Sequence, residues 1–139
     1  MDMRKFTEKS IAALGKAQKI AREYGNQEIG QLHLAYALAT EEDGLIPALL
    51  KKMNKDEKAF ASALEREIAK LPKVSGGEEY TSRALADALE EGESQMNKMG
   101  DSYLSVEHLF YGLLEKADGT LKRIFKEFNI ETNAFMQAL

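Results

Sequence analysis

The stretch SVEHLFYGLL (residues 105–114) decides the fold, because GQLHLAYALA (residues 30–39) repeats its pattern earlier in the chain. Both stretches place apolar residues at helical spacing, and both carry a histidine at the fourth position. His33 and His108 lie 75 positions apart, and the same offset, without a gap, pairs Leu14 with Leu89, Gly25 with Gly100, Tyr36 with Tyr111, Asn54 with Asn129 and Phe60 with Phe135. A register held over this length indicates an internal duplication.

Each unit is predicted to contain four helices. The matched residues give their boundaries, since Ser, Thr and Asp favour helix starts and Gly or Asn favours helix ends. The expected starts are Thr7, Asp43, Ser82 and Asp118, and the expected ends are Gly25, Asn54, Gly100 and Asn129. No alternating pattern of a β-strand is present. The predicted fold class is all-α: two tandem four-helix repeats with pseudo-twofold symmetry, packed as one globular domain.

Composition divides the chain into three parts. Residues 1–71 form the first repeat, residues 72–79 form a Pro-, Ser- and Gly-containing linker, and residues 80–139 form the second repeat. The last helix of the first repeat is predicted to run from about residue 56 to 70 and so continues past Leu64, whereas the sequence stops at the equivalent Leu139. The chain is therefore expected to be a piece of a larger protein.

The composition excludes several kinds of partner and chemistry. Apolar residues make up 44% and charged residues 30% of the chain, with a net charge of −4, as in an ordinary globular protein. Acidic and basic residues are interleaved, so no basic face for nucleic acid is expected. No apolar run could span a membrane and no secretory signal is visible. The absence of cysteine excludes disulfides and thiolate catalysis and suits a cytoplasmic protein.

The histidines and the acid beside one of them are the candidate chemical groups. His33 and His108 could form a metal or proton-transfer site, but two histidines without cysteine and without H-E-x-x-H spacing are a poor metal set. We expect buried imidazoles, each hydrogen-bonded to a helix end. Glu107 is favoured near a helix N-terminus by the helix dipole, or it could meet a cationic or amide group of a peptide. Neither a phosphate-binding loop nor a G-x-S-x-G motif occurs, so no catalytic, cofactor or metal residue is assigned.

Three further segments carry a resemblance to a known family: FTEKSIAAL (residues 6–14), EEDGLIPALLKKM (41–53) and LPKVSGG (71–77). Together with the repeat, they make the whole chain resemble the Clp N-terminal repeat domain of the AAA+ unfoldases, and most of all its ClpB-type disaggregase branch. The resemblance implies a non-catalytic domain ahead of two ATPase modules, which use ATP and magnesium in a hexameric parent protein. The isolated domain is expected to be monomeric, with unfolded or aggregated proteins as its partners and adaptor proteins as further candidates.

The resemblance also implies a site. Family members take up apolar segments in hydrophobic grooves beside the first helix of each unit, assisted by polar side chains. Carried onto this sequence, the implied substrate-binding residues are Thr7, Ser82, Leu89, Asp101 and Glu107, and the internal repeat adds Leu14. Thr7 and Ser82 are equally explained as helix caps, and Leu14 and Leu89 as core residues.

Two other functions stay open. ClpC-type domains usually carry Thr-Glu-His in both units and bind adaptor proteins or phosphoarginine-marked substrates for ATP-dependent proteolysis. Here the equivalent residues are Gln31-Leu32-His33 and Val106-Glu107-His108, so the first unit lacks the acid that would grip a guanidinium. The third reading is a stand-alone helical adaptor with no ATPase attached.

Overall fold

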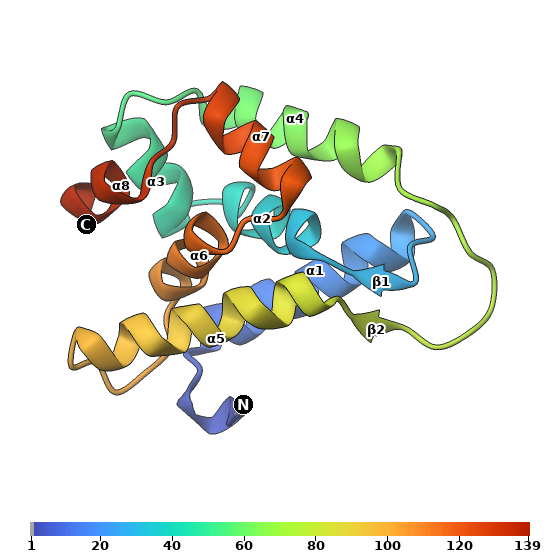
Figure 1. Ribbon diagram of the computed structural model, residues 1–139, viewed down its shortest axis with the longest axis horizontal. Helices are drawn as coiled ribbons and strands as arrows, with labels where there is room; N and C mark the ends of the chain where they lie inside the picture. The colour runs from blue at the N-terminus through green and yellow to red at the C-terminus, as the bar shows by residue number, and fades with distance from the viewer. Residues whose placement is uncertain (1) are drawn as a thin grey trace.

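The computed structural model of the chain describes residues 2–139 and is built almost entirely of helices (Figure 1). In chain order the elements are η1 (Met3–Lys5), α1 (Glu8–Glu23), β1 (Glu28–Ile29), α2 (Gln31–Ala39), α3 (Leu45–Lys52), α4 (Glu57–Ala69), β2 (Tyr80–Thr81), α5 (Arg83–Lys98), α6 (Val106–Glu115), α7 (Gly119–Glu127) and α8 (Thr132–Ala138). The predicted all-α class and the four helices of each repeat are confirmed.

Most helix boundaries follow the predicted capping residues. Thr7 Oγ1 accepts a hydrogen bond from Ser10 N at 3.1 Å, and Ser82 Oγ accepts one from Leu85 N at 3.0 Å. The helix ends at Gly25, Asn54, Gly100 and Asn129 adopt left-handed backbone angles, with φ of 72°, 61°, 73° and 54°.

The predicted cap at Asp43 is wrong, although its equivalent Asp118 caps α7 as expected. Gly44 holds the N-cap position of α3, and Asp43 lies in the tight turn before it with φ of 57°. The turn is closed by a hydrogen bond from Gly44 N to Glu41 O at 3.0 Å, so Asp43 is one residue too early to cap the helix.

The pseudo-twofold relation is visible in two backbone pairings that cross between the repeats. β1 pairs in parallel with β2, joining Ile29 to Thr81, and an isolated parallel bridge joins Leu104 to Phe6. An offset of 75 residues turns one pairing into the other, so the same crossing contact is made twice. Sequence analysis missed these strands because two residues are too few to show alternation.

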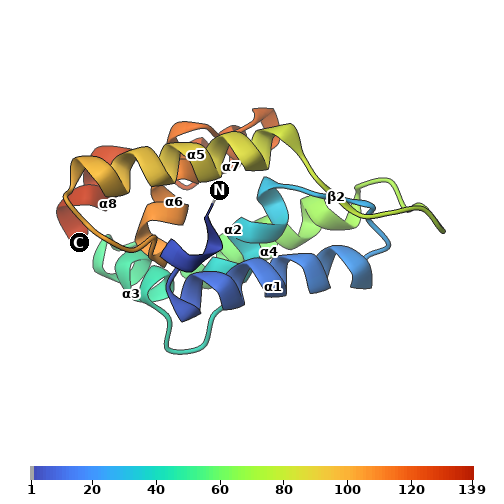
Figure 2. The same ribbon diagram turned by 90° about the horizontal axis from the view of Figure 1, so that it is seen from below.

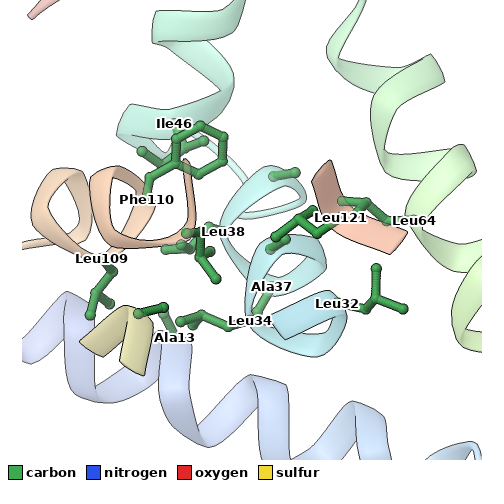
Figure 3. Close-up of a cluster of buried hydrophobic side chains, with 14 of the residues drawn as sticks. Ala13, Leu32, Leu34, Ala37, Leu38, Ile46, Leu64, Leu109, Phe110 and Leu121 are labelled. Carbon is green, nitrogen blue, oxygen red and sulfur yellow. The ribbon is translucent and has the colours of Figure 1, made fainter. Parts of the chain in front are cut away.

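The core is shared by both repeats. In α2 every residue except Tyr36 is buried, and Figure 2 shows α2 and α6 between α1 on one face and α5 on the other. Leucines of α2 meet Leu109 and Phe110 of α6 in the centre (Figure 3). Phe60 of the first repeat stacks on Phe125 of the second with ring centroids 5.8 Å apart. The halves therefore form one continuous core.

The two repeats differ in how closely their first two helices approach. A Cβ atom added at Gly112 of α6 would lie 2.0 Å from Ala88 O, and one added at Gly92 of α5 would lie 2.6 Å from His108 O. The equivalent positions in the first repeat are Ala17 and Ala37, whose methyl groups keep α1 and α2 further apart. This difference bears directly on the clefts described below.

Residues 72–79 contain no helix, in agreement with their composition, but they are tied to the end of α1. Val74 N donates to Gly25 O at 2.9 Å, and Asn26 Nδ2 donates to Pro72 O at 3.1 Å. Arg22 pairs with Glu79 at 2.7 Å. The segment is therefore a fixed strap along the first repeat.

Among the helices of residues 2–139, none has the length and apolar character needed to cross a bilayer.

Candidate functional site

A shallow apolar hollow lies beside α1, and we call it the α1 hollow. Its volume is about 60 Å³, and its lining residues are Lys9, Ala12, Ala13, Ala37, Leu38, Glu41, Gly44, Leu45, Ile46 and Val106. Leu45 is 40% exposed at the edge of this lining. The charged side chains Lys9 and Glu41 are the exceptions in this lining. An apolar side chain of a partner could therefore bury surface here.

The equivalent position beside α5 is filled by Gln31, which corresponds to Val106 in the repeat. Gln31 is 1% exposed, and its Nε2 donates to Ala84 O at 2.8 Å and to Lys116 O at 2.7 Å. Its Oε1 accepts a hydrogen bond from Asp118 N at 2.8 Å. Gln31, Ala84 and Asp118 also line the larger cavity beside the start of α5, so this surface presents an amide where the α1 hollow presents Val106. The two halves therefore differ as docking surfaces.

Three of the implied polar residues come together where Phe6 crosses to Leu104. Thr7 N donates to Leu104 O at 3.0 Å, and Asp101 Oδ2 accepts from His108 Nε2 at 2.9 Å. Glu107 lies in the same first turn of α6 as Val106, which lines the α1 hollow. None of the three lines the α1 hollow itself, and their role in binding stays a prediction.

The other three implied residues lie elsewhere. Ser82 is buried at the opposite crossing, where it caps α5. Leu14 and Leu89 are half-buried against the core, and neither lines the α1 hollow. Sequence reasoning missed Val106, Leu45 and Gln31. The sequence signal that could have found them is the pair Gln31 and Val106. These residues hold equivalent positions in the two repeats, and an amide in one repeat against an apolar side chain in the other indicates a local difference between the halves.

A second cavity, of about 420 Å³, opens at the crossing of β1 and β2 between the starts of α2 and α5. It is lined in part by Leu32, which stands where the second repeat carries Glu107, and by the strap residues Pro72 and Val74. Leu32 is 6% exposed and brings no charge. The acid that a guanidinium would need at this position is therefore absent.

The two histidines are structural. The Nδ1 of His33 accepts a hydrogen bond from Gly30 N at 2.9 Å, and that of His108 accepts from Ser105 N at 2.8 Å. These amide donors leave the proton on each Nε2, which donates to Asn26 Oδ1 at 3.0 Å and to Asp101 Oδ2 at 2.9 Å respectively. Each imidazole therefore accepts a hydrogen bond from the backbone N–H at the start of its helix, as expected. Across residues 2–139, no group of three His, Cys, Asp or Glu side chains is arranged to hold a metal ion.

Burial lowers the pKa of His33 from 6.5 to about 4, and the hydrogen bond from Gly30 opposes this only in part. The unfolded chain therefore binds one more proton than the folded chain between these values. The stabilisation that comes from keeping His33 neutral is fully present above pH 6.5. It is lost as the pH falls from 6.5 to about 4, by about 1.4 kcal/mol per pH unit and about 3 kcal/mol in all. Urea unfolding at pH 7.0 and 5.5 measures the loss, and His33→Gln should remove this slope. An imidazole NMR titration with a midpoint near 6.5 in the folded protein would contradict it.

Comparison with known proteins places the chain in a family. The model of the Clp repeat (R) N-terminal domain matches residues 5–128, and the chain belongs to this family. The chaperone protein ClpB of Nitratidesulfovibrio vulgaris is 43% identical over 145 residues, and that of Clostridium tetani is 36% identical over 144 residues. Both alignments cover 100% of this chain and 17% of the relative, so the chain spans only a small part of the length of these chaperones.

Solved structures share the fold at lower sequence identity. The N-terminal domain of Hsp104 from Candida albicans superposes with a TM-score of 0.83 at 22% identity, over 96% of this chain and 87% of that one. The N-domain of ClpV in its complex with a VipB peptide superposes with a TM-score of 0.73 at 16% identity, over 98% of this chain and 88% of that one. The resemblance to ClpB-type domains inferred from the sequence is thereby confirmed.

Proposed function

We propose that this chain is the substrate-docking domain of a ClpB-type disaggregase and that the α1 hollow makes the first contact with unfolded or aggregated polypeptides. The observation that carries the proposal is a hollow lined mainly by apolar side chains, with Leu45 left exposed at its edge. The similarity to ClpB chaperones supports it, and a ClpV N-domain with the same fold binds a peptide. In the parent protein, ATP and magnesium belong to hexameric ATPase modules that receive the substrate.

The size of the hollow favours weak binding. About 60 Å³ accommodates little more than the tip of one side chain, so each contact buries a small apolar area. We expect dissociation constants from millimolar to micromolar, which correspond to about 4 to 8 kcal/mol. Weak binding suits a domain that must release its substrate to a motor. Thr7, Asp101 and Glu107 would add hydrogen bonds to the bound segment.

The test replaces two lining residues by those that the second repeat carries at the equivalent positions. Ala12→Asp copies Asp87 and Leu45→Thr copies Thr120, so both side chains already occur in the same fold. The double variant should bind an unfolded casein about tenfold more weakly, because it loses apolar contact area and gains a carboxylate at the hollow. NMR titration measures the affinity and locates the shifts, which should centre on α1 and the start of α3.

The matched control is Ala86→Asp, which adds the same charge to an exposed position of α5. Unchanged casein binding in Ala12→Asp/Leu45→Thr, or an equal loss in the control, would refute the role of the α1 hollow. Free phosphoarginine should not shift the resonances around Leu32, because this site has lost its acid. A specific shift there would favour the ClpC-type alternative instead.

A further inference from the structure

A separate cleft lies between the end of α6, α7 and the start of α8, and we call it the α7 cleft. Its volume is about 380 Å³, and its lining residues are Leu114, Ala117, Lys122, Phe125, Lys126, Asn129, Ile130, Glu131 and Thr132. None of these residues lines the α1 hollow. The α7 cleft is therefore a separate site from the α1 hollow.

The duplication supplies an internal reference for this surface. Leu114 corresponds to Ala39, Ala117 to Glu42 and Ile130 to Lys55. At each of these positions the second repeat is more apolar than the first, and two of the changes remove a charge. These three positions of the α7 cleft are therefore more apolar in the second repeat than in the first.

The charges at the cleft changed as well. In the first repeat Lys51 pairs with Glu57 at 3.7 Å. The equivalents are Lys126 and Thr132, and the Thr132 hydroxyl donates to Glu115 at 2.7 Å, so Lys126 has lost its acidic partner. Lys122 replaces Pro47 one turn earlier on α7 and, like Lys126, makes no ion pair within residues 2–139.

We infer that the α7 cleft binds an acidic peptide segment of a partner protein that carries one apolar anchor side chain. The anchor enters between Leu114, Ala117 and Phe125, and carboxylates on either side of it pair with Lys122 and Lys126. Two lysines one helical turn apart match neighbouring acidic side chains, and hydrogen bonds between an ammonium group and a carboxylate are stronger than those between neutral groups. Glu131 is the acid among the lining residues, which leaves the lining with a net positive charge in a chain whose net charge is −4.

The test uses a capped peptide of sequence Asp-Asp-Leu-Asp-Asp, titrated against the domain by NMR. Shifts should centre on α7 and the ends of α6 and α8, and binding should weaken at least tenfold between 50 mM and 500 mM salt because the charges are exposed. Lys122→Glu/Lys126→Glu should weaken binding at least tenfold. Ala117→Glu, which restores the residue of the first repeat, should do the same without touching the lysines.

The control variant Lys58→Glu/Lys98→Glu makes the same change of net charge at exposed positions outside the cleft and should bind as the parent chain does. Ala12→Asp/Leu45→Thr should also leave binding intact, which separates this inference from the docking role of the α1 hollow. Equal binding of Lys-Lys-Leu-Lys-Lys, equal binding of Asp-Asp-Ser-Asp-Asp, or unchanged affinity in Lys122→Glu/Lys126→Glu would overturn the inference. Sedimentation showing that a second copy of the chain fills the cleft would overturn it too.

Discussion

Replacing Gln31 by valine should destabilise the domain by about 2 to 4 kcal/mol, although valine is the residue of the equivalent position 106. Gln31 holds Asp118 N, Ala84 O and Lys116 O by three hydrogen bonds of 2.7 to 2.8 Å. A hydrogen bond of this kind contributes about 0.5 to 1.5 kcal/mol to stability, and valine can make none of the three. Because the amide reaches from α2 to α5 and to the start of α7, its loss should loosen the contact between the two repeats.

Urea unfolding followed by circular dichroism measures this change. The matched control is Gln137→Val, which alters an exposed glutamine of α8 and should shift stability by less than about 0.5 kcal/mol. A loss below about 1 kcal/mol in Gln31→Val would mean that the three backbone groups find other partners, and that Gln31 does not hold the two repeats together.

Gly112→Ala should destabilise the domain by about 2 to 4 kcal/mol, the reverse of the usual effect of this change within a helix. Alanine normally favours a helix by about 1 kcal/mol over glycine. Here the new Cβ would lie 2.0 Å from Ala88 O and 2.9 Å from Ala88 C, which are backbone atoms that cannot rotate away. The helices α5 and α6 would have to separate, and the packing they share would be lost.

Gly15→Ala is the matched control, because a Cβ at Gly15 of α1 meets nothing within 4 Å. It should stabilise the domain by up to about 1 kcal/mol. Thermal and urea unfolding of both variants give the comparison, and opposite signs are expected. A stabilised Gly112→Ala variant would show that α5 and α6 can separate at no cost.

The duplication made most of the fold predictable. A constant offset of 75 residues carried most helix boundaries from one repeat to the other, and Thr7 and Ser82 cap their helices as predicted. The predicted cap at Asp43 was wrong because Asp43 lies in a tight turn closed by the hydrogen bond from Gly44 N to Glu41 O. Asp43 therefore does not hold the N-cap position that Asp118 holds in the second repeat. The short crossing strands were not predicted, because they form by pairing with segments about 50 to 100 residues away. Local periodicity carries no information about such partners.

The candidate site was less predictable than the fold. The resemblance implied similar grooves in both halves, whereas the position equivalent to Val106 of the α1 hollow carries Gln31, which is hydrogen-bonded to three backbone groups. The polar residues implied by the family, Thr7, Asp101 and Glu107, do not line the hollow, and their part in binding stays a prediction. The difference between the halves depends on Gln31, which is hydrogen-bonded to three backbone segments, and on Gly92 and Gly112, which allow α5 and α6 to pack closely. Both are long-range features that residue types alone do not reveal.

The crossing pairs Phe6–Leu104 and Ile29–Thr81 have a consequence for the origin of the molecule. Each half completes its backbone hydrogen bonds on the other, so a forerunner with a single copy would have met the same need only as a symmetric homodimer. With both copies in one chain, the association is intramolecular and independent of protein concentration. Exact symmetry is then not required, and equivalent positions can differ, as Gln31 and Val106 do.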